Sequence, residues 1–427
     1  MLKISGNPTQ RQIELQQVAT DLESGKLIMN AMLLFSLLAK YEPALLATGK
    51  YSNSTAIING QKGLTIALFY LLYANLLSTH KAQINFDTVM TTLQSQNGQD
   101  FANTLKLLTK SNLLPQDAPD RAQANFDAII TILKTQHGGR FVQIFYLITS
   151  STNLLSANTP DRTQANFESI IAILNGQDAT YLYPTLCFLK QSELLSTSHA
   201  QANFDAVITI LKAQNGHSLY IALDFLKNTA RILTINNAQA NFDAITTIFK
   251  TQYGNHLIKI FGLITPSTNL LSANTPDRTQ ANFESITTIL NGQNAAHLYV
   301  VLYFLKQSTL LSASNAQSNF DAVIHLLNRP DGQYLASILT GLIQAGLLPT
   351  STPAEAQTNF QAVIECSNLA FLHEELTTHD KSAAQYQSVL SSMKRFGLLS
   401  STISSADRTP ASQAAAPTPV PSSTHSA

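Results

Sequence analysis

The octapeptide Ala200-Gln201-Ala202-Asn203-Phe204-Asp205-Ala206-Val207 contains one copy of the pattern that decides the fold, Gln-x-Asn-Phe. The pattern occurs eight times in 427 residues, at successive separations of 40, 41, 37, 38, 41, 37 and 40 residues. A period of about 39 residues is typical of stacked supersecondary units, each burying its apolar face against the next. We therefore expect a repeat protein. The Phe residues of the pattern are Phe86, Phe126, Phe167, Phe204, Phe242, Phe283, Phe320 and Phe360.

One unit, from Thr159 to Leu195, predicts a helical hairpin. Thr159-Pro160-Asp161 is a helix start, because Thr can cap, Pro suits the first helical position and Asp favours the positive end of the helix dipole. Asn175-Gly176 ends this helix, and a second helix follows. The apolar positions, spaced as on one helix face, are Phe167, Ile170, Ile171 and Leu174 in the first helix and Leu182, Leu186, Phe188 and Leu189 in the second.

Each second helix is expected to end at a residue that tolerates the left-handed conformation. Such a residue lets the chain turn, and the Leu-Leu pair after it packs back onto the last helical turn. In six units the residue is Asn or Gly, namely Asn75, Asn112, Asn153, Asn269, Gly346 and Gly397.

The Gln and Asn of the pattern lie at the edges of the apolar stripe. On a helical wheel centred on Phe167, Asn166 lies roughly 90° to one side and Gln164 roughly 70° to the other. We expect these amides to bond the loop or helix end of the adjoining repeat and so to set the spacing of the stack. The alternative is a row of amides that forms a ligand groove. The repeat-signature asparagines are Asn125, Asn166, Asn203, Asn241, Asn282 and Asn319.

An acidic residue follows the Phe in seven copies. We interpret it as a partner of the helix dipole in the first turn, and a row of cation-binding carboxylates is the alternative. The residues are Asp87, Asp127, Glu168, Asp205, Asp243, Glu284 and Asp321.

These units predict an all-α fold, an α-solenoid of about ten two-helix repeats with degenerate caps at both ends. Residues 1–80 form the N-terminal caps, with Ile13 and Tyr51 at the Phe position, and 81–350 form the regular array. Residues 351–399 hold the last repeat and a capping helix. Residues 400–427, rich in Ser, Thr, Ala and Pro, are expected to be disordered.

A longer period of 116 residues separates Phe126 from Phe242, Phe167 from Phe283 and Phe204 from Phe320. The segment from Thr152 to Arg162 recurs unchanged from Thr268 to Arg278, which indicates that a block of three units was duplicated. A solenoid tolerates such lengthening, whereas an active site rarely does. This favours a binding scaffold.

Composition and motifs favour a protein without catalytic, metal or cofactor sites. The 26 basic residues balance 26 acidic ones, so the chain lacks the basic excess typical of a nucleic-acid binder. Cys187 and Cys366 are interpreted as small core residues, and no phosphate-binding loop, zinc-protease or serine-hydrolase motif occurs. The densest ionisable cluster, His373 to Asp380, is interpreted as a solvated helix face, since His373 and His379 lie on opposite faces of a helix.

The Ala200–Val207 consensus, preceded by a Leu-Leu-Ser/Thr loop, resembles repeats in large helical proteins of Legionella-type intracellular gammaproteobacteria. The resemblance covers roughly residues 8 to 399. It implies a family in which many proteins look like effectors delivered into a host cell by a type IV secretion system. It supplies no catalytic residues.

The resulting hypothesis is a non-enzymatic scaffold for protein–protein interaction, with an effector role in a host cell as its finer form. The alternatives are a helical-repeat RNA-binding protein and a bacterial structural or surface protein. We expect a soluble monomer of the bacterial cytoplasm or, after translocation, of a host cell. No membrane span is expected, because the apolar runs are shorter than the roughly 20 residues that a bilayer requires.

Overall fold

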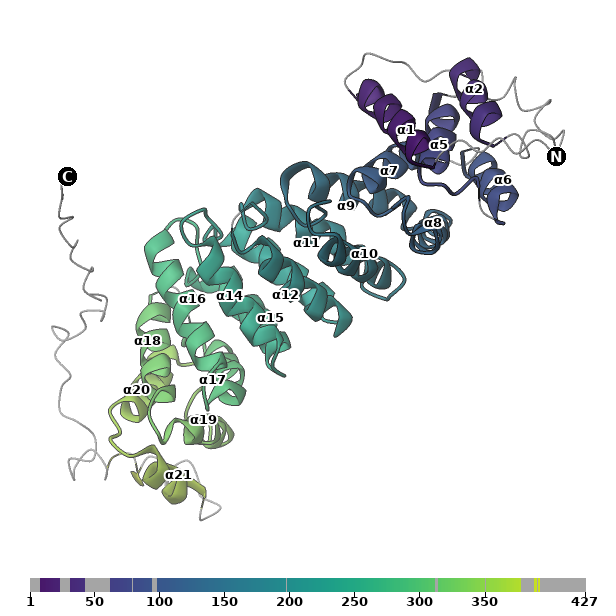
Figure 1. Ribbon diagram of the computed structural model, residues 1–427. Coiled ribbons are helices and arrows are strands. Elements are labelled where there is room, and N and C mark those ends of the chain that lie inside the picture. The colour runs from purple at the N-terminus through teal and green to yellow at the C-terminus, as the bar shows by residue number, and fades with distance from the viewer. Residues whose placement is uncertain are drawn as a thin grey trace, which may run out of the picture. The chain divides into compact units, whose positions relative to one another are not determined.

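The computed structural model describes residues 8–23, 31–42, 62–78, 80–93, 98–196, 198–311, 314–349 and 351–377, with 388, 389 and 391. Every element in these residues is a helix, which confirms the all-α fold (Figure 1). The chain divides into two compact units, Met1–Ala295 and Ala296–Ala427, and each is described by itself.

The first unit begins with two helices, α1 (Pro8–Glu23) and α2 (Ala31–Tyr41), that pack on α5 (Lys62–Tyr73). Helical hairpins follow, each with a front helix that carries Gln-x-Asn-Phe and a back helix. They are α6 (Ala82–Leu93) with α7 (Gly98–Lys110), α8 (Pro119–Leu133) with α9 (Gly138–Ser151), α10 (Pro160–Leu174) with α11 (Ala179–Gln191), α12 (Ala200–Lys212) with α13 (Gly216–Asp224), and α14 (Ala238–Phe249) with α15 (Gly254–Thr268). A π-helix, η1 (Phe225–Thr229), continues α13, and α16 (Pro276–Leu290) is a further front helix.

Front helices pack against front helices and back helices against back helices. Each front helix from α6 to α14 contacts the next one, and the back helices from α7 to α15 contact each other in the same order. The succession α10, α12, α14 can be followed in Figure 1. The front helices therefore form one layer and the back helices a second layer, and the core runs along the unit between them.

The Phe of each motif lies in this core. All eight are buried, with 0–2% of each residue exposed. Burying such a side chain contributes about 1.5–3 kcal/mol. Ile171 and Phe188 were expected in the core, but both are partly exposed. Ile173 is buried in place of Ile171.

The helix start at Thr159 differs in part from the prediction. Pro160 occupies the first turn and Asp161 follows it, as expected. Thr159 makes no capping bond with its side chain, because its hydroxyl points to the carbonyl of Ser156 at 3.5 Å. The Thr163 hydroxyl bonds the same carbonyl at 2.8 Å, so this loop is held by hydroxyl groups on both sides of the helix start.

The prediction of left-handed helix ends is confirmed at four positions and is wrong at one. The φ angles are 63° at Asn75, 55° at Asn112, 56° at Asn269 and 72° at Gly346. Asn153 was expected to behave in the same way. Instead α9 ends at Ser151, and Thr152 is extended, with its hydroxyl accepting a bond from the Leu154 N–H at 3.2 Å.

Three other back-helix ends adopt positive φ without Asn or Gly, namely Glu193 at 60°, Arg231 at 55° and Thr309 at 56°. Gln214, which follows front helix α12, does the same at 60°. Left-handed backbone is unfavourable for such residues, so at the three back-helix ends the burial of the apolar pair that follows imposes it. Gly397, Tyr51, most of the predicted capping helix and the 400–427 tail lie outside the described residues.

The second unit contains α17 (Ala295–Gln307), α18 (Ala316–Leu327), a 3₁₀ turn η2 (Gly332–Tyr334), α19 (Leu335–Gln344), α20 (Pro353–Ile364) and α21 (Leu369–Thr377). Front helix α18 packs on α20, and back helix α19 packs on α21. The stacking rule of the first unit is thus repeated here.

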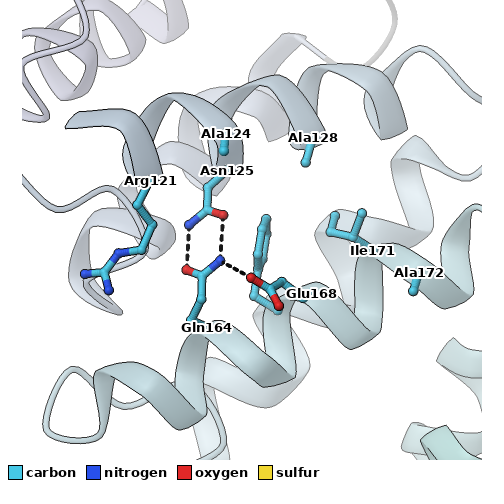
Figure 2. Close-up of a pocket in the computed structure, with 9 residues that line it drawn as sticks. Arg121, Ala124, Asn125, Ala128, Gln164, Glu168, Ile171 and Ala172 are labelled. Atoms are coloured by element: carbon cyan, nitrogen blue, oxygen red, sulfur yellow. Dashed lines mark hydrogen bonds between the residues drawn. The ribbon is translucent and has the colours of Figure 1, made fainter. Parts of the chain in front are cut away.

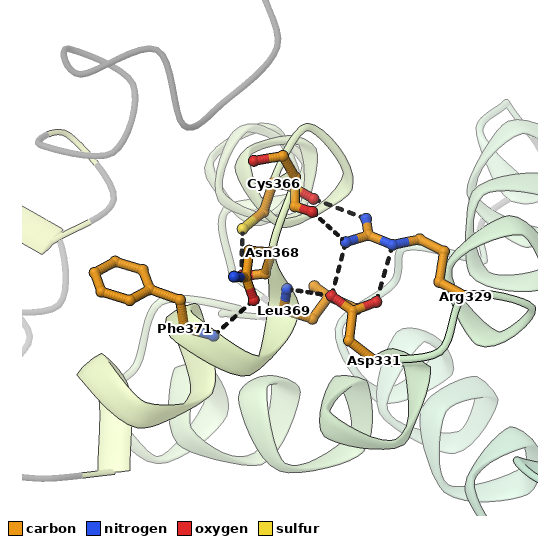
Figure 3. Close-up of polar contacts among 7 residues, drawn as sticks. Arg329, Asp331, Cys366, Asn368, Leu369 and Phe371 are labelled. Carbon is orange, nitrogen blue, oxygen red and sulfur yellow. Dashed lines mark hydrogen bonds and ion pairs between the residues drawn. The ribbon is translucent and has the colours of Figure 1, made fainter.

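A charged cluster joins the last two hairpins (Figure 3). The Arg329 guanidinium pairs with both carboxylate oxygens of Asp331, at 3.0 and 2.8 Å, and donates to the carbonyls of Cys366 and Ser367 at 2.8 and 2.7 Å. Asp331 also accepts the N–H of Leu369, the first residue of α21, at 2.7 Å. One arginine therefore satisfies the carbonyls that follow α20 while its partner caps α21.

The same turn position holds Asp178 in the first unit. Its carboxylate accepts the N–H of Gly216, at the start of α13, at 2.7 Å. A Cβ at Gly216 would lie 2.7 Å from that oxygen, so the close approach requires glycine. Inter-helix turns thus connect neighbouring repeats as well as the two helices of one hairpin.

We predict that Arg329→Met loosens the C-terminal hairpin. The substitution keeps the length of the side chain but removes four charge-assisted hydrogen bonds from a pair whose side chains are only 21% and 20% exposed. It should cost about 1–3 kcal/mol. Hydrogen exchange in α20 and α21 should accelerate by about 5–160-fold, which is the factor that these energies give at 25 °C. Arg278→Met, at an exposed position, is the control and should leave the exchange rates of α20 and α21 unchanged. Equal exchange rates in the two variants would show that the Arg329–Asp331 cluster does not hold these helices.

Candidate functional site

The two amides of the motif form a closed pair between neighbouring repeats. Asn203 on α12 donates from Nδ2 to Oε1 of Gln239 on α14 at 2.9 Å, and Gln239 donates from Nε2 back to Oδ1 of Asn203 at 2.9 Å. Asn203 is buried, and Gln239 lies at the edge of the core. Two reciprocal bonds of this kind fix both the distance and the rotation between two front helices.

The pair recurs along each unit as an amide ladder. Its pairs are Asn85–Gln123, Asn125–Gln164, Asn166–Gln201, Asn203–Gln239 and Asn241–Gln280 in the first unit, and Asn319–Gln357 in the second. The amides therefore bond between adjoining repeats, but here the Gln bonds a side chain of the neighbouring front helix and not the loop or helix end that was expected.

The second N–H of each Asn goes to the loop that precedes its own helix. It donates to the carbonyl of the first residue in the apolar pair that closes the previous unit, at 2.7–3.0 Å. The acceptors are Leu76, Leu113, Leu154, Leu194, Ile232, Leu270, Leu310 and Leu347. Each Asn thereby binds the end of one repeat to the start of the next.

This bond also explains why the period is uneven. The acceptor precedes its Asn by 9 residues in some units, as from Leu194 to Asn203, and by 12 in others, as from Leu154 to Asn166. The longer units start their front helix with Pro, as at Pro160. Three added residues are close to one helical turn, so the Asn returns to the same face and keeps its carbonyl.

The acidic residue after each Phe does not lie in the first turn, contrary to the dipole interpretation. Helix α12 begins at Ala200 and has no acidic residue in its first turn, whereas Asp205 lies later. Its carboxylate accepts the second Nε2 proton of Gln201, four residues earlier, at 2.8 Å. The same bond occurs at Asp87, Asp127, Glu168, Asp243, Glu284 and Asp321. The acid therefore orients the Gln for its inter-repeat bond.

All the amide N–H groups of a complete pair are consequently used within the protein. Figure 2 shows the bonds between Asn125 and Gln164 and from Gln164 to Glu168; this pair forms one wall of a pocket of ≈ 390 Å³ between α8 and α10. Asn125 donates to Leu113 and Gln164, and Gln164 donates to Asn125 and Glu168. Except at Gln357, whose unit has Gln361 in place of the acid, the complete pairs retain only carbonyl oxygens for a ligand, which disfavours the ligand-groove alternative.

The rest of that pocket is mainly apolar. Ala124, Ala128 and Phe167 belong to its lining, and Arg121 adds a guanidinium whose buried Nε has no hydrogen-bond partner in the described part of the chain. Lys81, its counterpart one repeat earlier, pairs with Asp127 at 3.0 Å.

A different surface lies on back helices α11 and α13, where aromatic rings gather. Tyr181 contacts His217 and Tyr220, with ring centroids 5.1 and 6.1 Å apart, and Phe188 contacts Tyr220 at 5.7 Å. Tyr181, Phe188 and Tyr220 are partly exposed and His217 is exposed. We call these four residues the aromatic platform. Sequence reasoning placed Phe188 in the core and missed the other three, because no helix-by-helix pattern shows which rings of two repeats meet.

The thiols are free, and neither belongs to a cluster suited to a metal. No group of three metal-ligating side chains occurs among the described residues. Cys366 is buried, which raises the pKa of its thiol, and Cys187 is partly exposed. A hydrogen bond with Cys187 raises the pKa of the Tyr183 phenol.

His373 was expected on a solvated helix face, but it packs between hairpins. Its ring stacks on Tyr334 at 4.9 Å, and its Nδ1 lies 2.9 Å from the Ser337 hydroxyl. The neighbouring repeat thus covers one face of the ring. His379 and Asp380 lie outside the described residues.

Comparisons of this chain with models of protein families, with curated proteins and with solved structures gave no match. In the described ranges, no helix has both the length and the apolar character needed to cross a bilayer. The interpretation of the surfaces therefore depends on their own chemistry.

We predict that Asn203→Leu destabilises the array well beyond the loss of one surface contact. The Leu194 carbonyl loses its donor, and Gln239 loses both of its bonds to Asn203. The free energy of unfolding should fall by about 2–4 kcal/mol, measured by urea denaturation. Asn175→Ala, at an exposed helix end, is the control and should stay within about 0.5 kcal/mol. A similar small change for both variants would rule out the amide ladder as a stabilising feature.

Alkylation should distinguish the two thiols. At pH 8 iodoacetamide should modify Cys187 at least about tenfold faster than Cys366, because burial and a raised pKa leave Cys366 with little accessible thiolate. Mass spectrometry of the two peptides over time measures both rates. Equal rates in the folded protein, with equal rates also in urea, would show that Cys366 is not protected by the fold.

Proposed function

We propose that this chain is a non-enzymatic helical-repeat scaffold that binds a protein partner. The proposal rests on the contrast between the repeated polar residues and the exposed aromatic residues. The most regular polar residues, the Asn–Gln pairs, are satisfied inside the array, whereas partly exposed rings such as Tyr181 and Tyr220 belong to particular repeats. Residues that maintain the stack are thus separate from residues available to a partner, and exposed aromatic rings are enriched where proteins bind each other.

The charge arrangement favours a protein partner over RNA. Four successive units place a basic residue five positions before the Phe, namely Lys81, Arg121, Arg162 and His199. An acidic residue follows the Phe in the same units, and Lys81 already pairs with Asp127. Rows of opposite charge lying side by side leave little net attraction for a phosphate backbone.

The finer part of the proposal concerns where the partner is found. From the resemblance of Ala200–Val207 to repeats of Legionella-type bacteria, we propose an effector that meets its partner inside a host cell. Bacterial surface attachment is the competing location. Fractionation of infected cells separates them, since an effector appears in the host cytosol and a structural protein stays with the bacterium.

Deletion of one duplicated block tests the scaffold role. Removing residues 159–274 joins Asn158 to Thr275 and restores the native sequence Ser-Ala-Asn-Thr-Pro-Asp-Arg across the junction. The shortened chain should remain helical by circular dichroism, because a solenoid loses only its nearest-neighbour contacts. Affinity capture from host lysate should then lose a defined partner that the full chain retains.

Two results would contradict the proposal. One is capture of the same proteins by both chains, which would place no binding surface in the deleted repeats. The other is catalytic turnover by the purified full chain.

A further inference from the structure

The pocket between α8 and α10 has a charged end and an apolar end. Arg121 lies at one end and Ile171 and Ala172 lie at the other, with the Asn125–Gln164 pair between them (Figure 2). Arg121 and Ile171 are partly exposed and Ala172 is exposed, so both ends are open to a ligand. A ligand that fills the pocket therefore needs a group for the guanidinium at one end and an apolar group at the other.

The guanidinium of Arg121 has no hydrogen-bond or ion-pair partner in the described part of the chain, although its Nε is buried. Its counterpart Lys81 pairs with Asp127, the acidic residue after the Phe of the next repeat. The equivalent acid for Arg121 is Glu168, which accepts Nε2 of Gln164 at 2.9 Å and lies on the opposite side of Gln164 in Figure 2. A buried N–H without an acceptor is unfavourable. Because a guanidinium matches a carboxylate with two parallel hydrogen bonds, a carboxylate is the group that suits this end.

The duplicated block keeps the stack but not the chemistry of this pocket. Of the nine lining residues, six are identical at the equivalent positions of α14 and α16 and three differ. The offset of 116 residues pairs these three as Arg121 with Asn237, Ile171 with Thr287, and Ala172 with Thr288. The copy lacks the charge and both apolar side chains, yet its Asn241–Gln280 pair is intact at 2.9 and 2.8 Å. The three residues are therefore not needed for stacking.

The pocket has the length of a few extended residues. Seven positions separate Arg121 from Ala128 on α8, and eight separate Gln164 from Ala172 on α10. At a rise of 1.5 Å per residue these stretches are about 10–12 Å long. An extended chain covers that length with three to four residues at about 3.3 Å each. Every second side chain of such a chain points to the same face, so side chains two residues apart enter the pocket together.

The middle of the pocket offers hydrogen-bond acceptors. The amide N–H groups of Asn125 and Gln164 are used within the protein, which leaves their carbonyl oxygens and the carboxylate of Glu168. An extended peptide presents backbone N–H groups to such acceptors, whereas the alkyl chain of a fatty acid presents none and would desolvate them. The chemistry of the pocket therefore favours a peptide. Selectivity depends on Arg121 and the apolar end, because the amide pair recurs in other repeats.

We propose that the pocket between α8 and α10 binds an extended segment of a protein partner in which an Asp or Glu lies two residues from a large apolar residue. The carboxylate pairs with Arg121, the apolar side chain packs on Ile171 and Ala172, and backbone N–H groups donate to Glu168 and the amide carbonyls. This inference rests on the proposed role as a protein-binding scaffold and names the chemistry that the scaffold recognises.

The peptide Ser-Leu-Ser-Glu-Ser-Leu-Ser tests the proposal on the full-length chain. It carries an uncharged fluorophore at its N-terminus and an amide at its C-terminus, so the glutamate is its only charged group. A leucine lies two residues from the glutamate on either side, so the peptide fits in both chain directions. Fluorescence polarisation should show saturable binding with a dissociation constant of about 10–500 µM, as expected of a short segment that buries a small area. Replacing Glu by Gln, or both Leu by Ser, should weaken binding at least about tenfold.

Variants that borrow the residues of the duplicate separate the two ends of the pocket. Arg121→Asn should weaken binding of the Glu peptide about tenfold and leave that of the Gln peptide unchanged, because the lost interaction needs both charges. Ile171→Thr combined with Ala172→Thr should weaken binding of the Glu peptide by about three- to tenfold, through its leucines. Lys134→Asn removes the same charge at the exposed C-cap of α8, outside the pocket, and should leave binding unchanged.

The proposal is overturned if the Glu peptide does not bind at about millimolar concentration, if the Gln peptide binds equally well, or if the Arg121→Asn variant binds the Glu peptide as the parent does. Equal circular dichroism spectra and urea midpoints of the variants establish that a loss is not due to unfolding. If the peptide does not bind while deletion of 159–274 still abolishes partner capture, the assignment of the pocket is wrong and the scaffold role stands.

Discussion

The rest of this structure depends on satisfying the buried side-chain amide of one asparagine per repeat. Its two N–H groups have different partners, since one bonds the loop before its helix and the other bonds the Gln of the next repeat, as at Asn203. A buried amide without partners costs about 1–3 kcal/mol per group. Both the loop and the neighbouring helix must therefore adopt one position, and the same requirement is renewed in every unit.

This constraint allows local variation wherever the bonds survive. A front helix gains a turn at Pro160 relative to Ala200, and the back helices end at Asn, Glu, Arg or Thr. The asparagine keeps its carbonyl in each case because the added length is close to a whole turn. The repeats are thus unevenly spaced in the sequence, although the Asn of each repeat makes the same hydrogen bond to a carbonyl.

The ladder also separates structure from recognition. In seven repeats the Gln is oriented by an acid four residues later, as Gln201 is by Asp205, and the Gln of a complete pair is also joined to the preceding Asn, so that such a pair has no N–H donors left. The rings of Tyr181 and Tyr220 meet across two repeats without entering that network. A surface of this kind can change between copies of a duplicated block while the stack is maintained.

The sequence by itself determined the repeat, the helical hairpins, the buried Phe and the boundary position of the amides, because period, helical spacing and turn residues are local signals. Only the tertiary structure decided which groups meet across repeats. The carboxylate of Asp205 accepts a hydrogen bond from Gln201 and does not interact with the helix dipole in the first turn. Phe188 contacts Tyr220 at the surface instead of entering the core. Left-handed Glu193 and Arg231 were likewise invisible in the sequence. Contacts between residues about 38 positions apart depend on how two helices pack, and no single-helix pattern contains that information.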